Sequence, residues 1–340
     1  MNEIICGDAL AVLRTIPDET VNTCITSPPY FGLRNYGVEG QIGLETSPEE
    51  YISRLVDIFR EVRRVLRSDG TLWVNIGDSY NGYKGNAKSD TNGSNYVGFR
   101  NQPARVSKYG LECKNMKPKD LIGIPWQLAF ALRTDGWYLR QDIIWSKPNP
   151  MPESVTDRCT KSHEYIFLLS KSLKYYYDNE TIKEPVAEAT IGRMKRGISD
   201  SHKNINGAPG QTPHTMNKPR LNMKNVQYDG QPSNSFHINR ANGGTDKKYE
   251  KRNKRSVWTV STKPYKGAHF ATFSIELITP CILAGCPPNG VILDPFMGSG
   301  TTAVAALTNN RNYIGIDLKP EYCESARKRI KKYTDCQVQT

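Results

Sequence analysis

The stretch that decides the fold is V-I-L-D-P-F-M-G-S-G-T-T-A-V-A-A-L-T-N-N-R-N-Y-I-G-I-D, residues 291–317. An apolar run ends at Asp294, a glycine turn follows, and a helix is predicted to begin at Thr301. A second apolar run ends at Asp317. This order of strand, turn, helix and strand predicts one βαβ unit of an open parallel sheet.

The glycine turn predicts a ligand site. In open parallel sheets, ligands lie beyond the carboxyl ends of the strands, where the strand-to-helix turn lets the backbone approach them. Gly298 and Gly300 leave this turn without side chains, and Asp317 has the spacing of an acid that holds ribose hydroxyls. We therefore expect a ligand that contains a ribose. The plainer alternative is a turn that only packs the helix on the strand.

The turn does not match a dinucleotide fingerprint. It lacks the third glycine of G-x-G-x-x-G, and Asp294 would meet the pyrophosphate with a negative charge. A carboxylate at this place suits a cationic or amino-bearing ligand. S-adenosylmethionine has an ammonium group, a sulfonium, a ribose and an adenine, and it has no phosphate, so it is the cofactor that we expect.

A second motif, T-S-P-P-Y at residues 26–30, follows the predicted strand V-N-T-C-I. Proline fixes its own φ and lacks an N–H donor, and it pushes the preceding residue away from helical geometry. The segment therefore presents the Ser27 hydroxyl and backbone carbonyls as a stiff set of hydrogen-bond acceptors. Taken alone, the motif is also compatible with a Pro-Pro turn that carries a core tyrosine.

Beside a methyl donor, these acceptors suit an exocyclic amine of a nucleobase. Such an amine is a poor nucleophile because its lone pair is delocalised into the ring. The Ser27 oxygen and the Pro28 carbonyl would bind the amine hydrogens and favour a lone pair directed at the methyl group. The amine is inaccessible inside a stacked duplex, so the base must leave the helix, and the ring of Tyr30 could stack on it.

Strands and helices alternate over residues 1–80. The apolar patterns predict strands in 2–8, 21–26 and 71–78, and helices in 9–16 and 48–66. Ser47 and Pro48 form a start signal for the second of these helices. The alternation predicts a parallel sheet covered by helices. Residues 81–117 are rich in Gly, Asn and Lys and predict a long loop, after which a helix and two strands follow before residue 171.

The charge of the chain indicates a polyanionic partner. Its 340 residues carry 46 Lys and Arg against 34 Asp and Glu, a formal charge of +12. Residues 181–255 contain 15 Lys and Arg against 6 Asp and Glu, so this segment holds most of the excess. Such a surplus favours binding to phosphates with counterion release. The segment has no regular apolar period, so a disordered insertion is the alternative to a basic arm that closes on nucleic acid.

The two motifs together resemble those of the DNA amino-methyltransferases, which make N4-methylcytosine or N6-methyladenine. T-S-P-P-Y precedes D-P-F-M-G-S-G-T-T, and the long basic segment lies between them. This order is similar to that of the β group, in which the usual methyltransferase sheet is circularly permuted. The likeness covers most of the chain. Further matching segments are G-D-A-L, T-L-W-V-N-I-G-D, G-W-Y-L-R-Q-D-I-I-W-S-K-P-N-P-M-P, S-H-E-Y-I-F-L-L-S-K, H-F-A-T-F-S-I-E-L-I and Y-I-G-I-D-L.

The resemblance implies a Rossmann-like α/β methyltransferase fold, circularly permuted, with a basic target-recognition region inserted at residues 181–255. Residues 1–180 would form the catalytic half and residues 256–340 the cofactor-binding half. The residues implied at the target base are Ser27, Pro28, Pro29 and Tyr30. Those implied at the cofactor are Asp8, His269, Phe270, Asp294, Phe296, Gly298, Gly300, Thr301 and Asp317. Ser274 departs from the pattern, because the family commonly has proline there.

The implied activity is methylation of duplex DNA with S-adenosylmethionine. Serine at position 27 favours the N4 amine of cytosine over the N6 amine of adenine, as a tendency of the family. The alternatives are a methyltransferase acting on RNA or protein, and a non-catalytic DNA-binding protein. Double-stranded DNA is the expected partner, and the sequence leaves open a homodimer, a cognate restriction endonuclease and the DNA site that is read.

The remaining features predict a cytoplasmic protein without a membrane partner, and the resemblance implies a prokaryotic cell or a phage-infected host. The N-terminus lacks a basic region followed by an apolar stretch, and no apolar run approaches the length of a membrane span. The eight cysteines include no CxxC pair, so we expect reduced thiols and no metal site.

Overall fold

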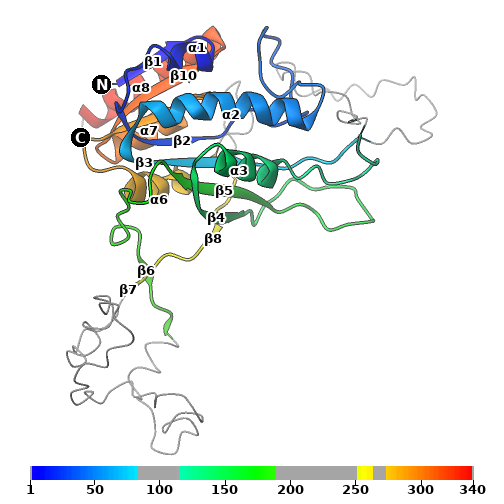
Figure 1. The fold of residues 1–340 in the computed structure, drawn as a ribbon. Helices are drawn as coiled ribbons and strands as arrows, with labels where there is room; N and C mark the ends of the chain where they lie inside the picture. The colour runs from blue at the N-terminus through cyan, green and yellow to red at the C-terminus, as the bar shows by residue number, and fades with distance from the viewer. Residues whose placement is uncertain (1, 83–112, 114, 189–250, 263–272, 339–340) are drawn as a thin grey trace, which may run out of the picture. The chain divides into compact units, whose positions relative to one another are not determined.

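The computed structural model describes every residue except 1, 83–112, 114, 189–250, 263–272 and 339–340 (Figure 1). The chain divides into two compact units. The first unit contains residues 1–182 and 255–340, and the second contains residues 183–254. The predicted functions of the three segments 1–180, 181–255 and 256–340 stay predictions.

The first unit contains an eight-stranded sheet in the order β1-β10-β9-β2-β3-β5-β4-β8. The strands are β1 (Asn2–Cys6), β2 (Val21–Thr26), β3 (Leu66–Ile76), β4 (Tyr138–Ser146), β5 (His163–Ser170), β8 (Val257–Thr259), β9 (Val291–Asp294) and β10 (Asn312–Asp317). The first five strands of this order run parallel, as the alternation over residues 1–80 and the C-terminal βαβ unit predict.

The sheet is mixed, because β5 is antiparallel to both β3 and β4. The 16 residues between β4 and β5 contain no helix that could carry the chain back across the sheet. Without such a crossover, two successive strands pair antiparallel. The expectation of a parallel sheet is therefore confirmed for residues 1–80 and does not extend to the strand at 163–170.

Helices cover both faces of the sheet. They are α1 (Ala9–Leu13), α2 (Pro48–Val65), α3 (Ile124–Thr134), α6 (Ile275–Gly285), α7 (Thr301–Thr308) and α8 (Pro320–Val338). One buried apolar cluster contains residues of α1, α2 and α3, and a second cluster contains residues of α6, α7 and α8. Figure 1 shows α2 and α6 on opposite sides of β3. The predicted α/β class with a Rossmann-like fold is confirmed, and circular permutation stays a prediction from motif order.

Helix α2 begins where the sequence predicts. Ser47 is the N-cap, and its hydroxyl accepts a hydrogen bond from the Glu50 N–H at 3.2 Å. Pro48 occupies the first turn, where an N–H would have no partner within the helix. The buried stripe of α2 includes Tyr51, Leu55 and Phe59, which repeat at the period of a helix. This stripe packs the helix over the parallel strands.

Strand β3 begins at Leu66, five residues before the predicted start at Thr71. Val21 pairs with Leu66 and Thr23 pairs with Thr71, so the register shifts between these two pairs. Between these two pairs β3 advances by five residues and β2 by two, so the extra residues of β3 form a bulge. A bulge of this kind depends on the partner strand, and the apolar pattern of β3 alone does not indicate it.

The second unit has few described residues. Its strands β6 (Glu184–Pro185) and β7 (Lys251–Arg252) pair antiparallel, and the Arg252 guanidinium donates to Glu184 at 2.9 Å. Residues 189–250, which include most of the predicted target-recognition region, lie outside the described residues. The same holds for most of the predicted loop at 81–117.

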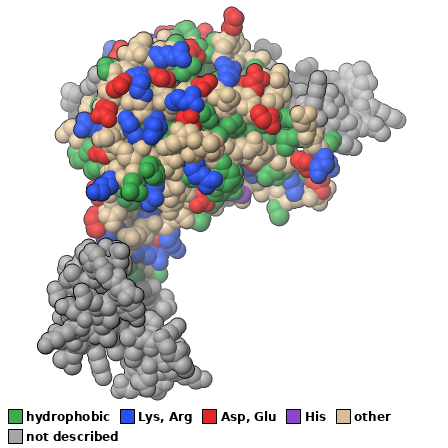
Figure 2. All heavy atoms as spheres, viewed as in Figure 1, with side chains coloured by type: hydrophobic (Ala, Val, Ile, Leu, Met, Phe, Trp, Pro, Cys, Tyr) green, Lys and Arg blue, Asp and Glu red, His purple; other side chains and the backbone are tan. Residues whose placement is uncertain are grey.

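Charged side chains of both signs cover the first unit on the face drawn in Figure 2. Lys and Arg are interspersed there with Asp and Glu. Within the described residues, no helix is long and apolar enough to cross a membrane. No group of three or more His, Cys, Asp or Glu side chains in that part of the chain could hold a metal ion.

Gly315 of β10 packs against Met297 of the glycine turn, and this position has no room for a side chain. A Cβ at this position would lie 2.2 Å from Cε and 2.9 Å from Cγ of Met297. Met297 is buried, and its N–H donates to the carbonyl of Ile316 at 2.8 Å. The backbone of the turn therefore lies directly against the strand.

We expect Gly315→Ala to lower the free energy of unfolding by about 1–3 kcal/mol, the usual cost of overpacking a core. Urea denaturation measures this change. Met297→Ala in the same chain removes the clashing atoms, so the double variant should lose less than the sum of the two single variants. Additive losses would show that the turn does not depend on this contact.

Candidate active site

The two sequence motifs meet where β2 and β9 end side by side. Cys24 pairs with Leu293, so Thr26 and Asp294 leave the sheet at the same edge. After β9 the chain enters α7 on one face, and after β2 it reaches α2 on the other face. A reversal of this kind opens a crevice at the carboxyl ends of the strands, which is the usual place for a ligand.

The Asp294 carboxylate joins the two motifs by hydrogen bonds. The Thr26 hydroxyl donates to Oδ1 at 2.6 Å, and the Thr302 hydroxyl donates to Oδ2 at 2.6 Å. The Phe296 N–H also donates to Oδ1, at 3.1 Å. Asp294 is buried, and burial raises its pKa to about 6 in spite of these three donors. The acid predicted from sequence as a ligand contact is thus also the link between β2, β9 and α7.

A cavity of about 140 Å³ opens at this edge of the sheet. One buried water occupies about 10–15 Å³ on this measure, so the cavity has room for a ligand of many atoms. The predicted residues that line it are Asp8, Ser27, Pro28, Pro29, Tyr30, Asp294, Phe296, Gly298, Thr301 and Asp317. Gly300 lies in the turn behind the lining, and His269 and Phe270 lie outside the described residues.

The glycine turn has a backbone that favours glycine at two positions. Gly298 has φ 52° and Gly300 has φ 78°, both in the left-handed region. A Cβ on Gly300 would also lie 3.0 Å from the Cβ of Ala326 in α8. The turn therefore approaches both the cavity and α8 closely, as the sequence predicts for the ligand side.

Asp317, the last residue of β10, lines the cavity. The Gly298 N–H donates to its Oδ2 at 2.9 Å, and the Lys319 N–H donates to its Oδ1 at 2.9 Å. Burial raises the pKa of Asp317 and outweighs these bonds. Asp8 lies on the neighbouring strand end and caps α1 by accepting from the Ala11 N–H at 2.9 Å. Two carboxylates from adjacent strands thus face one ligand space.

The T-S-P-P-Y segment provides acceptors on the other side of the cavity. The Ser27 hydroxyl donates to the Tyr30 oxygen at 3.5 Å, which leaves its own lone pairs open. In the part of the chain that the structure describes, no group donates to the Pro28 carbonyl. The Pro29 carbonyl differs, because it accepts from the Tyr51 hydroxyl at 2.8 Å. Ser27 and Pro28 therefore carry the acceptors that remain available.

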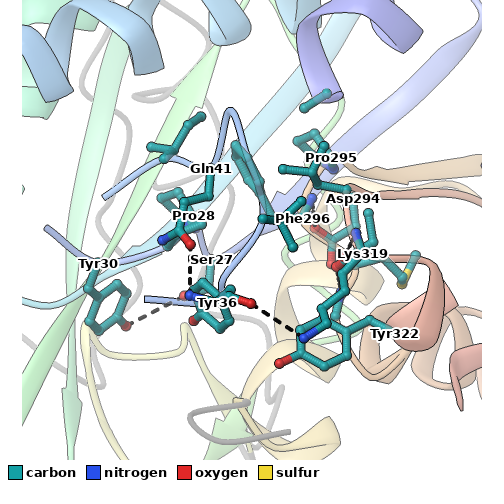
Figure 3. A pocket seen from close by; sticks show the side chains of 18 of the residues that line it. Ser27, Pro28, Tyr30, Tyr36, Gln41, Asp294, Pro295, Phe296, Lys319 and Tyr322 are labelled. Atoms are coloured by element: carbon teal, nitrogen blue, oxygen red, sulfur yellow. Dashed lines mark hydrogen bonds between the residues drawn. The ribbon is translucent and has the colours of Figure 1, made fainter. Parts of the chain in front are cut away.

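The lining also includes residues that the sequence analysis did not predict, among them the polar side chains of Tyr36, Gln41, Lys319 and Tyr322 (Figure 3). Tyr36 meets Tyr322 edge to face, with ring centroids 6.2 Å apart. The Lys319 ammonium donates to the Tyr36 carbonyl at 3.4 Å, and the Gln41 side chain accepts from the Tyr36 N–H at 2.7 Å. Lys319 and Tyr322 follow Asp317 closely, but no local pattern marks Tyr36 or Gln41.

The chain matches the family model described as DNA methylase over residues 21–328. The chain belongs to the DNA methylase family. Two relatives support the assignment over nearly the whole length. The Type II methyltransferase M.Cfr9I of Citrobacter freundii is 45% identical over 326 residues, covering 95% of this chain and 86% of the relative. The Type II methyltransferase M.SmaI of Serratia marcescens is 43% identical, covering 96% of this chain and 90% of the relative.

Solved structures share the fold of this DNA methylase. PvuII DNA methyltransferase, described as cytosine-N4-specific, has a TM-score of 0.56 at 18% identity, and the match covers 98% of this chain and 90% of that chain. The Thermus thermophilus protein TTHA0409, solved as a complex with S-adenosyl-L-methionine, has a TM-score of 0.55 at 20% identity, with 98% and 94% covered.

The DNA methylase is an S-adenosylmethionine-dependent DNA amino-methyltransferase. The cavity fits this cofactor by its charge, because its described lining contains three carboxylates, Asp8, Asp294 and Asp317, against one basic side chain, Lys319. Such a lining suits a cation without phosphates. The aromatic rings of Tyr36, Phe296 and Tyr322 give the cavity apolar walls. A dinucleotide would meet negative charge at the turn.

The raised pKa of Asp294 has a measurable effect on stability. An unfolded Asp titrates near pH 3.9, whereas the folded carboxyl titrates at about 6. Between these values the folded state binds more protons, so this group contributes stability below about pH 4 that is lost as the pH rises through 6. Each unit of pKa difference corresponds to about 1.4 kcal/mol, or about 3 kcal/mol here.

Asp294→Asn removes this titration. We expect the stability advantage of the wild type over the variant to be greater at pH 4 than at pH 7, by up to about 3 kcal/mol. Urea denaturation at pH 4, 5 and 7 measures the advantage, and pH effects of other groups cancel in the comparison. An advantage that stays constant, or one that grows with pH, would contradict the account of Asp294.

Proposed function

We propose that this DNA methylase transfers a methyl group from S-adenosylmethionine to the exocyclic N4 amine of cytosine in duplex DNA. The observation that carries the proposal is the pair of open acceptors, Ser27 Oγ and the Pro28 carbonyl, in one cavity with the acidic pocket. Serine rather than aspartate at this position favours cytosine over adenine, in keeping with the tendency noted from the sequence.

The acceptors act on the amine by geometry and electrostatics. Ser27 Oγ and the Pro28 carbonyl would bind the two amine hydrogens, so the nitrogen becomes pyramidal and its lone pair is freed from the ring. Preset φ angles at the two prolines keep both acceptors in place before the base arrives. When bound, the cofactor would supply an electrophilic methyl group and leave as a neutral thioether, and the methylated amine would lose one proton to solvent. No covalent intermediate with the protein is needed.

Tyr30 would receive the base. The amine is inaccessible within a stacked duplex, so the nucleotide has to leave the helix and be held by stacking. Tyr30 lies two residues after Pro28 and lines the same cavity. Its ring lies against the backbone of Gly77, where a Cβ would lie 2.6 Å from Tyr30 Cε2, and its hydroxyl donates to Glu164 at 2.7 Å. A ring held in this way offers a defined surface without the entropy cost of ordering it.

Asp317 and Asp8 would hold the nucleoside end of the cofactor, and the glycine turn would carry the methionine part. Asp317 is the better candidate for the ribose hydroxyls, because two backbone N–H groups fix its carboxylate and leave lone pairs on both oxygens. Phe296, Tyr36 and Tyr322 would pack on the apolar parts of the ligand.

Residues 181–255 would read the DNA site, as proposed from their charge and their place between the two motifs. The relatives M.Cfr9I and M.SmaI carry the name Type II methyltransferase, which supports a companion restriction endonuclease for this chain too. A homodimer stays a proposal that size-exclusion chromatography with light scattering tests directly.

Mass spectrometry of nucleosides tests the acceptor base. Duplex DNA incubated with the enzyme and cofactor is digested to nucleosides, and we expect N4-methyldeoxycytidine to appear. The control is DNA incubated without cofactor. N6-methyldeoxyadenosine in place of the cytosine product would overturn the choice of base, and methylation of RNA or protein but not DNA would overturn the proposed function.

Asp317→Asn tests the cofactor pocket. The amide keeps the size of the side chain and loses one acceptor oxygen and the negative charge, so we expect the dissociation constant for the cofactor to rise about 10- to 100-fold. Isothermal titration calorimetry measures it in the absence of DNA. Asp69→Asn, at an exposed acid outside the cavity, is the matched control. Equal affinity of Asp317→Asn and wild type would place the cofactor elsewhere.

A further inference from the structure

A partly buried polar network surrounds the Tyr30 hydroxyl, and the proposed reaction does not yet use it. The Tyr30 hydroxyl donates to Glu164 Oε2 at 2.7 Å, and the Asn75 amide donates to the same oxygen at 3.2 Å. The Lys147 ammonium pairs with the other oxygen, Glu164 Oε1. Three donors from separate segments thus converge on one carboxylate directly beside the acceptor motif.

The sheet holds this network in a fixed register. Glu164 lies on β5 and pairs with Trp145 of β4, and Lys147 directly follows the end of β4. The Lys147 and Glu164 side chains are only 17% and 14% exposed. The Lys147 ammonium also lies 4.3 Å from the centre of the Trp145 ring. A buried ion pair is weak evidence for stability, because well-packed apolar residues often replace it without loss, so a functional use deserves a test.

Each hydrogen bond of the network has a defined donor, because the Tyr30 hydroxyl has a single hydrogen to donate. Glu164 Oε2 accepts this hydrogen at 2.7 Å, whereas Oδ1 of the Asn75 side chain lies farther from the Tyr30 oxygen, at 3.4 Å. Burial, with the charge of Glu164 as the next cause, raises the pKa of Tyr30 well above its usual value, so the hydroxyl stays protonated. Tyr30 is therefore a donor toward Glu164, and its oxygen is an acceptor on the other side.

The same order of donors continues to Ser27. The Ser27 hydroxyl donates to the Tyr30 oxygen at 3.5 Å, as the dashed line in Figure 3 marks. Its hydrogen is then directed at the Tyr30 oxygen, and its lone pairs remain for a donor. A Ser27 hydrogen turned toward the cavity would instead face the hydrogens of the amine. The hydroxyl is useful for the proposed reaction in only one of these two orientations.

We propose that Glu164 is a positioning residue that acts through Tyr30 to hold the Ser27 hydroxyl as an acceptor for the target amine. The inference rests on the proposed function, since it concerns the same amine. Lys147 and Asn75 keep the carboxylate in place, and the absence of a side chain at Gly77 leaves room for the Tyr30 ring. The orientation is set before the substrate binds, which is the condition for electrostatic preorganisation.

A double-mutant cycle tests the chain of hydrogen bonds. Tyr30→Phe keeps the aromatic face and removes the hydroxyl, and Glu164→Gln keeps the size of the side chain and removes its charge. We expect each single variant to slow methyl transfer about 10- to 100-fold in single turnover at saturating DNA and cofactor. The double variant should be no slower than the slower single variant, because both break the same chain.

Base capture and cofactor binding provide readouts that do not depend on methyl transfer. With 2-aminopurine at the target position, Tyr30→Phe and Glu164→Gln should keep the fluorescence increase of base extrusion. Tyr30→Ala should lose it, because the stacking face is gone. The dissociation constant for the cofactor should stay within about twofold of wild type in both conservative variants. A loss of either signal would indicate a structural role for Glu164.

The matched control is Asp157→Asn, which removes an exposed carboxylate paired with Lys119 at 2.8 Å. We expect it to transfer methyl groups at the wild-type rate. If Glu164→Gln does not fold, the cycle between Ser27→Ala and Tyr30→Phe tests the same chain, and it too should be non-additive.

Multiplicative effects of the two changes, or a wild-type rate in Tyr30→Phe, would overturn the inference. These outcomes differ from a failure of the proposed function, in which the wild type itself would leave duplex DNA unmethylated. Methylation of adenine by the wild type would change the acceptor base and leave the cycle as a valid test of Glu164.

Discussion

The hydrogen bonds from Thr26 and Thr302 to the buried Asp294 carboxylate hold the functional edge of the sheet together. They connect the end of β2, the end of β9 and the first turn of α7, at 2.6 Å on each oxygen. The two motifs are 268 residues apart in sequence, yet Thr26 directly precedes the acceptor Ser27. The position of the proposed acceptors relative to the proposed cofactor pocket therefore depends on this one carboxylate.

The cavity beside this link has two halves of different character. One half is acidic, with Asp8, Asp294 and Asp317 from adjoining strand ends, and it suits a cationic cofactor without phosphates. The other half offers neutral oxygens from Ser27 and Pro28, which suit an amine donor. Methyl transfer between two such ligands needs their reacting atoms in line, so in the proposed function a rigid connection between the halves would contribute directly to the rate.

The sequence predicts those features of the fold and the site that depend on the backbone conformation of neighbouring residues. The turn at Gly298 and Gly300 requires left-handed φ angles, and the start of α2 at Ser47 requires a cap, so each leaves a pattern in neighbouring residues. Glu164 leaves no such pattern, because its contact with Tyr30 depends on the register of β5 against its neighbours β3 and β4. The antiparallel direction of β5 likewise depends on how the chain connects two strands. Such features come from tertiary pairing.

A crystal structure with S-adenosylhomocysteine and a duplex containing the target cytosine tests the central claim most directly. The account predicts the cofactor product in the cavity against Asp317 and the glycine turn, and an extruded base whose amine lies within hydrogen-bond distance of Ser27 Oγ and the Pro28 carbonyl. A cofactor bound elsewhere, or a base whose amine contacts neither acceptor, would contradict it.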